Sequence, residues 1–359
     1  MHTEFTKAEP VLCHRSALLF HRTPPIVHEL VGRYPDLLTR ADKAACLNED
    51  NPLALFGDPL HLLVQTKAMT HASAHCSFHY RRGGYPQGAV IMTDYNIHVT
   101  SPLATLLDLA ITWPIPHLSM ILYEMMGSFA VFRPTPPIRE LLQGLIDRGM
   151  LPVLHGWKPA LSKGKLTDVW RRPPLLASFQ VERFLAGNES AKGSRKLQLA
   201  LRDAHEGSAS PFEAQSSMLL GMPKRRGGWN LGPFEHNKKI GLTQQARIIA
   251  GKATCYGDLY IEGTETHPAI LFECQGGAFH DSGAIASADD SRAVALQSMG
   301  IVLIRLRYEQ ISDPMRLECI VSFISKLMGR PFTRKSERLK RAEIRLRALV
   351  LVDWWNLGL

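Results

Sequence analysis

Asp258 and Glu273 are two acidic residues whose spacing in the chain indicates a common site. They lie in strand-like segments, residues 254–261 and 269–275, on either side of a turn at residues 263–268. A hairpin centred on that turn pairs Asp258 with Glu273 and places their Cβ atoms about 5 Å apart. Two carboxylates at that distance repel each other unless a proton or a cation lies between them. The pair therefore predicts a site for a divalent ion such as Mg²⁺, which prefers oxygen ligands. A surface hairpin with a polar face is the alternative.

Gln275 lies two residues after Glu273, so the two side chains share one face of the predicted strand. Ile270, Phe272 and Cys274 occupy the other face and are expected to pack behind it. The amide of Gln275 can hold a water through hydrogen bonds, but it contributes no positive charge.

The elements that must position these side chains form a mixed series of helices and strands. Ser210-Pro-Phe-Glu213 predicts a helix start, with Glu213 in a capping box. The expected elements, in chain order, are a helix at residues 210–221, an extended pair at 229–242, the hairpin, a loop at 276–288, a helix at 289–299, a strand at 301–307 and a helix at 313–328. This order predicts a compact α/β domain.

Together these residues resemble the core of the PD-(D/E)XK nucleases. The similarity is carried, in chain order, by Glu213 on an upstream helix, Asp258, Glu273-Cys-Gln275, Gly276-Gly-Ala-Phe-His280 and Asp289-Asp-Ser-Arg292. The spacing is most similar to Vsr-like endonuclease domains of the very-short-patch-repair type, and the similarity spans residues 206–330. It implies a restriction-endonuclease-like mixed sheet flanked by helices.

The resemblance also implies roles for individual residues. Asp258 and Glu273 would bind one or two Mg²⁺ or Mn²⁺ ions, and Glu213 would be a third acid near the metal in addition to its capping role. His280 would act as a general acid or base near the phosphate, or it is a plain polar residue of the loop. Gln275 stands where the family has a lysine that orients the attacking water. That departure implies a slower enzyme, a lysine supplied from elsewhere or an inactive site.

The segment His98-Val-Thr-Ser-Pro-Leu-Ala-Thr-Leu-Leu-Asp-Leu-Ala110 carries a second resemblance, to AbiEi-like antitoxin-type regulators. This similarity covers residues 11–200 and implies an α+β fold and a toxin or other protein partner, although residues 1–60 contain no clear winged helix. The expected division is residues 1–125 as the AbiEi-like α+β region, 126–205 as a helical and basic connection, 206–330 as the Vsr-like nuclease-fold domain and 331–359 as a basic C-terminal helix.

The charge of the chain predicts a polyanionic partner such as DNA. Lys and Arg number 42 against 33 Asp and Glu, which gives a net charge of +9. The C-terminal helix is the most basic stretch, and four of its residues are expected to contact DNA phosphates: Arg338, Lys340, Arg341 and Arg345. The alternative is that they form the solvated face of a packed helix.

His71, His75 and His79 recur every four residues, with Cys76 among them. On a helix they would share one face, and histidines four apart can bind zinc. A strand at residues 73–80 is the alternative, since no acid or further cysteine completes the ligand set.

Targeting signals are not expected in this sequence. The six cysteines are scattered without a CxxC pair, which is typical of reduced thiols in a cytoplasm. No stretch approaches the roughly 18 apolar residues of a membrane helix, so no membrane partner is predicted. Glu4, Lys7 and Glu9 lie where a signal peptide would be apolar, which favours a cytoplasmic protein.

Two functions therefore compete. The first is a metal-dependent DNA endonuclease that hydrolyses phosphodiester bonds in bacterial defence or DNA repair. The second is a DNA-binding, antitoxin-like regulator that has the nuclease fold and weak or no catalytic activity. The acid pair and the positive charge favour the first, whereas Gln275 and the AbiEi-like region favour the second.

Overall fold

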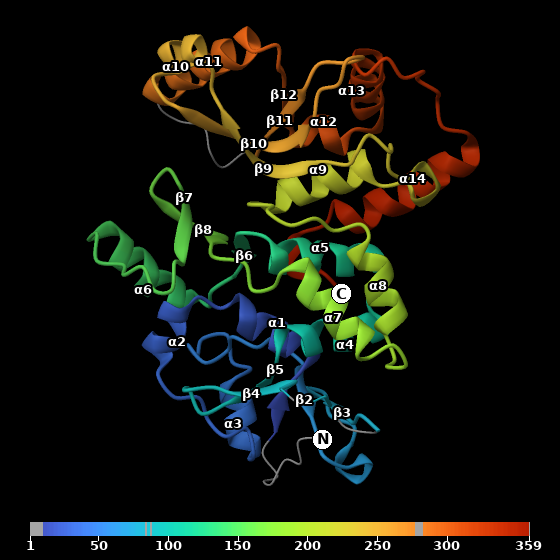
Figure 1. The fold of residues 1–359 in the computed structure, drawn as a ribbon. Coiled ribbons are helices and arrows are strands. Elements are labelled where there is room, and N and C mark those ends of the chain that lie inside the picture. Colours follow the sequence, from blue (N-terminus) through green and yellow to red (C-terminus); the bar gives the residue numbers. More distant parts are fainter. Residues whose placement is uncertain (1–9, 83–84, 87, 277–282, 359) are drawn as a thin grey trace. The chain divides into compact units, whose positions relative to one another are not determined.

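The structure is a computed structural model that describes residues 10–82, 85–86, 88–276 and 283–358, with the backbone alone for residues 283–289. The chain has mixed α/β character and divides into two compact units (Figure 1). Unit 1 comprises Met1–Ile121, Phe129–Leu201 and Gly358, and unit 2 comprises Leu122–Ser128 and Arg202–Leu357. Each unit is described by itself.

Unit 1 contains a five-stranded sheet of order β3-β2-β1-β5-β4. Its strands are β1 (Val11–Leu12), β2 (Leu60–Leu63), β3 (Cys76–His79), β4 (Val90–Met92) and β5 (His98–Thr100). The pairs β2–β3 and β1–β5 are parallel, whereas β1–β2 and β4–β5 are antiparallel. The nearby helical elements are α1 (His14–Arg22), α2 (Pro25–Val31), α3 (Arg40–Ala45) and η1 (Lys67–Met69). Leu12, Leu62 and Val99 of the sheet belong to one hydrophobic core.

A second sheet of unit 1 has the order β6-β8-β7. Its strands are β6 (Phe129–Val131), β7 (Lys158–Ser162) and β8 (Lys165–Arg171). The helices of this part are α4 (Pro102–Thr112), α5 (Ile115–Met126, whose last residues belong to unit 2), α6 (Pro136–Asp147), α7 (Ser178–Ala186) and α8 (Ser194–Leu201). Ser101 caps α4 by accepting a hydrogen bond from Ala104 N at 3.3 Å.

Unit 2 contains a four-stranded sheet of order β12-β11-β10-β9. Its strands are β9 (Glu235–Gly241), β10 (Thr254–Ile261), β11 (Ile270–Gln275) and β12 (Val302–Arg307). Strand β10 pairs in antiparallel fashion with β9 on one side and with β11 on the other, and β12 lies parallel to β11. The sheet is therefore mixed, and its chain order requires a crossover between β11 and β12.

Helices cover both faces of this sheet. Phe272 packs edge-on against Phe234 and faces α9 (Pro211–Gly221), which contacts β10 and β11. Leu271 points to the opposite face, where it shares a core with Ala246 and Leu296. Those two residues belong to α10 (Gln244–Ala250) and to the crossover helix α11 (Gly283–Ser298).

The C-terminal part of unit 2 is helical, with α12 (Tyr308–Ser312), α13 (Pro314–Leu327) and α14 (Glu337–Val350). Asp313 caps α13 by accepting hydrogen bonds from Met315 N and Arg316 N at 2.8 and 2.9 Å. Two short 3₁₀ helices are η2 (Lys224–Arg226) and η3 (Trp354–Asn356). Among the described residues, no helix combines the length and the apolar character needed to cross a bilayer.

Two sequence predictions about unit 2 were wrong. The expected extended pair at residues 229–242 contains one strand, β9, because the preceding backbone is hydrogen-bonded to the end of α9. Trp229 N donates to Leu219 O at 3.1 Å, and Leu231 N donates to Leu220 O at 2.9 Å. The expected loop at residues 276–288 was too long, since α11 begins at Gly283. Alanine at positions 284, 286 and 288 favours that earlier start.

Candidate acidic site on the four-stranded sheet

The hairpin register predicted from the sequence is confirmed for three residue pairs, but the predicted pair of Asp258 with Glu273 is not part of the ladder. Leu259 pairs with Phe272, and the two following pairs continue the same register. The strand pairing stops immediately before Asp258, whose side chain instead accepts a hydrogen bond from Cys274 N at 2.6 Å. Pairing with β9 also omits Asp258, beside Asn237, which has a positive φ of 48°. Asp258 therefore lies at a one-residue interruption of the ladder with β9 and at the end of the ladder with β11, and its carboxylate bonds the backbone of Cys274 near the end of β11.

Glu273 is held by two arginines from different elements. Its side chain is buried, and Arg292 of α11 forms an ion pair with Oε1. Arg305 of β12 approaches Oε2 with its Nε at 3.2 Å. Arg292 also donates a hydrogen bond to the backbone oxygen of Tyr256 on β10. The two guanidinium groups compensate the charge of Glu273 and connect α11 and β12 to the candidate site.

Gln275 has an unsatisfied polar atom at the same site. Its Oε1 is buried and has no hydrogen-bond partner among the described residues. Strand alternation places Gln275 on the face of Glu273, as the sequence predicts. A buried amide oxygen without a partner is energetically costly, so this oxygen is a candidate ligand for a cation or a water.

Glu213 lies at the expected helix cap and connects it to the sheet. Its Oε1 accepts from Ser210 Oγ at 3.0 Å, and its Oε2 accepts from Ala209 N at 2.8 Å. Asn237 of β9 donates to Oε2 at 3.0 Å. Ser210 caps α9 by accepting a hydrogen bond from Glu213 N at 3.2 Å, as predicted, but the carboxylate of Glu213 bonds Ala209 N in place of the N-cap N–H of a capping box. The same carboxylate contacts β9 at Asn237, beside Asp258.

Electrostatic interactions couple Asp258 to Glu213 and to Glu273. Burial, followed by the charge of Asp258, raises the pKa of Glu213 to about 8. Burial also raises the pKa of Asp258, and Glu273 adds to that increase, while the Cys274 N–H and Arg292 oppose it. The pKa of the Cys274 thiol is raised by burial first and then by all three carboxylates. Burial and the nearby carboxylates make the charged forms of Glu213 and Asp258 costly, which favours a proton or a cation there, whereas the charge of Glu273 is compensated by its two arginines.

The available donors fit a hard divalent cation. Asp258 and Glu273 offer carboxylate oxygens, and Gln275 offers its unpartnered amide oxygen. Oxygen donors of this kind are those that Mg²⁺ and Mn²⁺ prefer. Because both oxygens of Glu273 contact arginines, an ion bound there would have to replace part of the Arg292 contact.

Arg305 and Arg307 are candidate site residues that the sequence analysis did not single out. On β12 they pair in register with Glu273 and Gln275, respectively, so they share the face of the acids. Both residues are exposed. The signal in the sequence is their spacing of two residues at the end of a predicted strand, which places both charges on one face.

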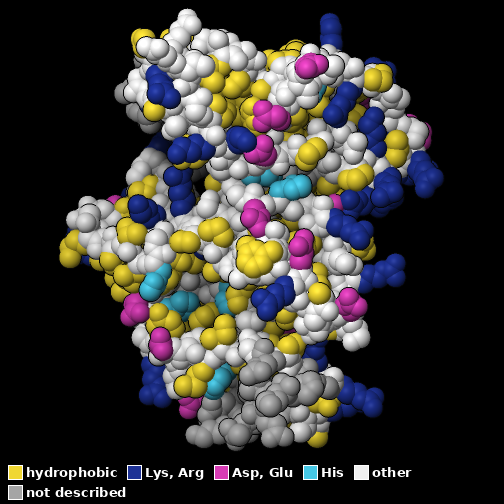
Figure 2. Space-filling view, viewed as in Figure 1, with side chains coloured by type: hydrophobic (Ala, Val, Ile, Leu, Met, Phe, Trp, Pro, Cys, Tyr) yellow, Lys and Arg dark blue, Asp and Glu magenta, His cyan; other side chains and the backbone are white. Residues whose placement is uncertain are grey.

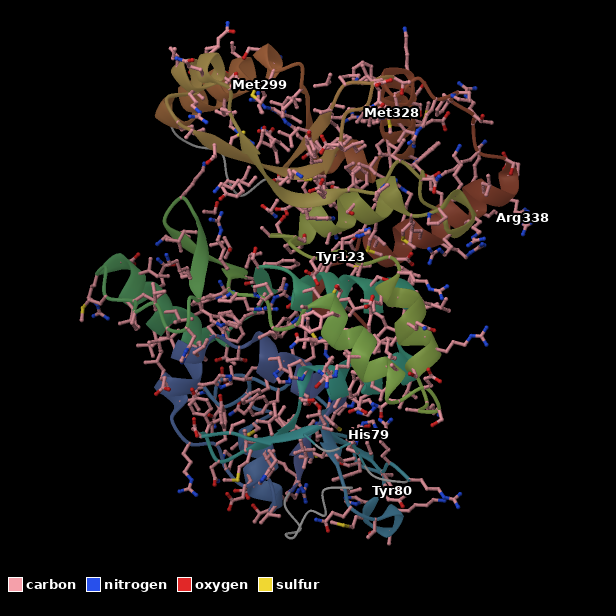
Figure 3. The ribbon with its side chains drawn as sticks, in the orientation of Figure 1. His79, Tyr80, Tyr123, Met299, Met328 and Arg338 are labelled. Carbon is pink, nitrogen blue, oxygen red and sulfur yellow. The ribbon has the colours of Figure 1, made fainter. Side chains whose placement is uncertain are left out.

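The basic residues predicted on the C-terminal helix lie on the exposed face of α14. Figure 2 shows Lys and Arg side chains gathered over this helix, and Figure 3 shows Arg338 extending outward from it. The buried face contains Ala342, Leu346 and Val350. Lys340 is paired with Glu337 at 2.9 Å. All four residues predicted to contact DNA are exposed, namely Arg338, Lys340, Arg341 and Arg345.

Two further sequence predictions concern histidines. His280 lies outside the described residues. The helical zinc face of His71, His75 and His79 was wrong, because His79 lies on β3 and the first two precede that strand. Among the described residues, the group of three candidate metal ligands is instead Cys13, His14 and His79.

Comparisons with known proteins do not identify the chain. No family model, curated protein or solved structure matches it. The assignment of a function therefore rests on the residues of the site and on their geometry.

Proposed function

We propose that unit 2 is a divalent-metal-dependent nuclease domain that hydrolyses DNA phosphodiester bonds, with a PD-(D/E)XK fold of the Vsr-like kind. The mixed sheet, covered by helices on both faces, agrees with the fold that the sequence resemblance implies. One observation carries the proposal. Asp258 is electrostatically coupled to both Glu213 and Glu273, and the buried amide oxygen of Gln275, two residues after Glu273 on the same strand face, has no partner among the described residues.

Asp258, Glu273 and Gln275 would hold the cation, which agrees with their oxygen donors. When bound, Mg²⁺ or Mn²⁺ polarises the scissile phosphate and lowers the pKa of a bound water. Glu213 keeps a proton near neutral pH because of its raised pKa, and it thereby limits the repulsion felt by Asp258.

The chain also provides groups that could act on the phosphate and on the water. Arg305 and Arg307 lie beside the acids and would contact the negatively charged phosphate oxygens. The amide of Gln275 would hold the attacking water, in the place of the lysine that the family has. On α14, Arg338 and its exposed neighbours would bind the DNA backbone without reading its sequence.

A second function is favoured by the ion pairs of Glu273. Both of its oxygens already have arginine partners, so the site is electrostatically compensated without a metal. A DNA-binding regulator, antitoxin-like and paired with a toxin or another protein, would retain this arrangement. A cytoplasmic role in bacterial defence or DNA repair is compatible with either function.

Metal-dependent cleavage tests the proposal directly. Supercoiled plasmid and single-stranded DNA would be incubated with the full chain and Mg²⁺ or Mn²⁺, alongside Asp258→Asn and Glu273→Gln. Glu265→Gln is the matched control, because Glu265 is exposed in the turn of the same hairpin. We expect cleavage that both site variants lose and the control keeps. A folded protein that binds DNA and cleaves neither substrate would instead support the regulator.

A further inference from the structure

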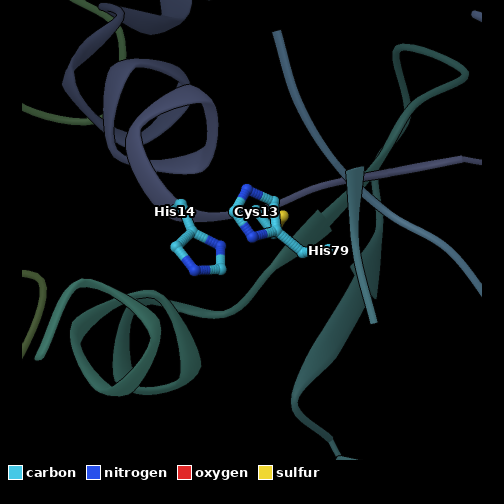
Figure 4. A group of neighbouring side chains, drawn as sticks. All are labelled: Cys13, His14 and His79. Atoms are coloured by element: carbon cyan, nitrogen blue, oxygen red, sulfur yellow. The ribbon is translucent and has the colours of Figure 1, made fainter. Parts of the chain in front are cut away.

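The geometry points to a transition-metal site in unit 1, formed by Cys13, His14 and His79 and suited to Zn²⁺. One ligand atom from each residue lies within 4.8 Å of the other two (Figure 4). This site uses none of the acidic residues of unit 2, so it is independent of the proposed nuclease function. It binds a soft ion through a thiolate and two imidazoles, whereas the acidic site suits a hard ion.

The first strands of the chain bring these residues together. Cys13 directly follows β1, and its backbone N–H donates to His61 O on β2 at 3.0 Å. His79 ends β3, which pairs in parallel with β2. The site therefore joins the start of α1 to β3 across the intervening strand β2.

The backbone at His14 supports a functional interpretation. His14 is the first residue of α1 and has a φ of +48°. Few residues other than glycine adopt a positive φ, and such conformations concentrate at functional sites. At this position the conformation allows the side chains of two consecutive residues, Cys13 and His14, to approach His79 together (Figure 4).

The donor types and spacings fit a tetrahedral zinc ion. Zn–S distances are about 2.3 Å and Zn–N distances about 2.0–2.1 Å, so ligand atoms of one ion lie about 3.3–3.6 Å apart. The ligand atoms must approach by about 1 Å from a separation of at most 4.8 Å. Because the rings of His14 and His79 are stacked with centroids 3.7 Å apart, one ring must also turn so that both lone pairs point at the ion. Three protein ligands leave the fourth position of the ion to a water molecule or another group.

The two imidazoles have the hydrogen-bonding pattern expected of ligands. Nδ1 of His14 is buried and has no hydrogen-bond partner among the described residues; Asp108 Oδ2 lies 3.9 Å away. His79 contacts His61 Nδ1 at 2.9 Å and Ser77 Oγ at 3.2 Å through its Nε2. Metal-bound histidines commonly use their second ring nitrogen in this way, and here Nδ1 of His79 would bind the ion.

Zinc binding at this site would form a bond between the metal and the Cys13 sulfur and would release the thiol proton to solvent.

Cobalt titration of the metal-free full chain tests the site. We expect one equivalent of Co²⁺ to bind, with a thiolate-to-cobalt charge-transfer band and the visible bands of a tetrahedral ion, and Zn²⁺ to displace it. Cys13→Ser should lose the charge-transfer band, and His79→Asn should bind at least tenfold more weakly. Cys46→Ser and His71→Asn are the controls and should bind as the wild type does, because Cys46 is an equally buried cysteine and His71 lies outside the cluster.

X-ray absorption of the wild-type zinc complex keeps the test valid if a variant fails to fold. The expected shell has one sulfur at about 2.3 Å and two imidazole nitrogens at about 2.0–2.1 Å. A folded wild type that binds no Co²⁺ or Zn²⁺ would overturn the proposal. A zinc shell without sulfur, or a charge-transfer band that persists in folded Cys13→Ser, would overturn it as well.

Discussion

The carboxylate of Asp258 accepts a hydrogen bond from the backbone N–H of Cys274 at 2.6 Å, at the point where β10 and β11 cease to pair. The Asp258 side chain thereby takes the place of a backbone acceptor in the strand ladder. It holds the Asp258 carboxylate beside Cys274, the residue that follows Glu273. The second carboxylate oxygen of Asp258 is not used in this bond. This arrangement positions an oxygen donor for a cation without requiring the strands to rearrange.

The raised pKa of Glu213 predicts a pH-dependent stability. Folded Glu213 holds its proton up to about pH 8, whereas the unfolded chain releases it near the ordinary value of 4.5. Between these values the folded state binds more protons, so the free energy of unfolding falls as the pH rises. We expect Glu213→Gln to reduce this fall, as measured by urea unfolding at pH 5, 6.5 and 8. Glu265→Gln should leave it unchanged, and an unaltered pH profile in Glu213→Gln would contradict the assignment.

Removing Arg292 should couple stability to metal. Arg292→Gln leaves buried Glu273 with Arg305 as its remaining cationic partner, which should cost about 1–3 kcal/mol in the presence of a chelator. Mg²⁺ should restore part of this loss, because it supplies the missing positive charge. Thermal unfolding would be compared without Mg²⁺ and with Mg²⁺ at about a hundred times its dissociation constant, where saturation of the site stabilises the fold by about 2.7 kcal/mol.

Arg225→Gln is the matched control for that experiment, since Arg225 is exposed on η2 in the same unit. It should lose no stability in the presence of a chelator, and Mg²⁺ should stabilise it less than Arg292→Gln, because its Glu273 keeps the Arg292 partner with which the ion competes. Equal stabilisation of both variants by Mg²⁺ would mean that the ion does not replace Arg292 at Glu273.

Substitution of Gln275 tests its role in catalysis. Gln275→Leu removes the amide and should lower metal-dependent cleavage by about 10²-fold, the effect of losing one oriented hydrogen-bonding group. Gln275→Lys introduces the charge that the family resemblance leads us to expect and should raise the cleavage rate. Both rates would be measured on plasmid at saturating metal. A Gln275→Leu variant as active as the wild type would remove Gln275 from the mechanism.

The exposed face of α14 should determine part of the DNA affinity. Replacing Arg338, Arg341 and Arg345 together by Gln should weaken binding to all sequences alike, since side chains that bind phosphates do not read bases. On duplex DNA, the slope of log affinity against log salt should decrease by about 0.9 for each phosphate that the variant no longer neutralises. Fluorescence anisotropy over a salt series measures both quantities.

A triple variant of equal charge, Arg225→Gln, Arg316→Gln and Lys326→Gln, is the control for α14 because these residues are also exposed in unit 2. If both triple variants lose the same affinity, net charge rather than α14 determines binding. An unchanged salt slope in the α14 variant would exclude this helix from the interface.

The hairpin of the candidate site could be predicted from the sequence because the residues that determine its register are close together in the chain. Strand alternation and the short turn between β10 and β11 determine which residues face each other, and the register followed directly. The cap at Ser210 was equally local, since Ser210 and Glu213 are three residues apart. The start of α11 and the segment before β9 were missed, because each depends on competition between elements that only the folded chain resolves.

Contacts between distant residues were decided by the tertiary structure. Nothing in the local sequence pairs Glu273 with Arg292 and Arg305, since β12 joins β11 only after the crossover through α11. In the same way, the sequence left His79 either on a helix with His71 and His75 or on a strand at residues 73–80, and strand pairing places it on β3, near Cys13 and His14. The periodicity of apolar residues in the sequence indicates which face of a helix or strand a residue occupies. Which other element packs against that face depends on the packing of the whole unit.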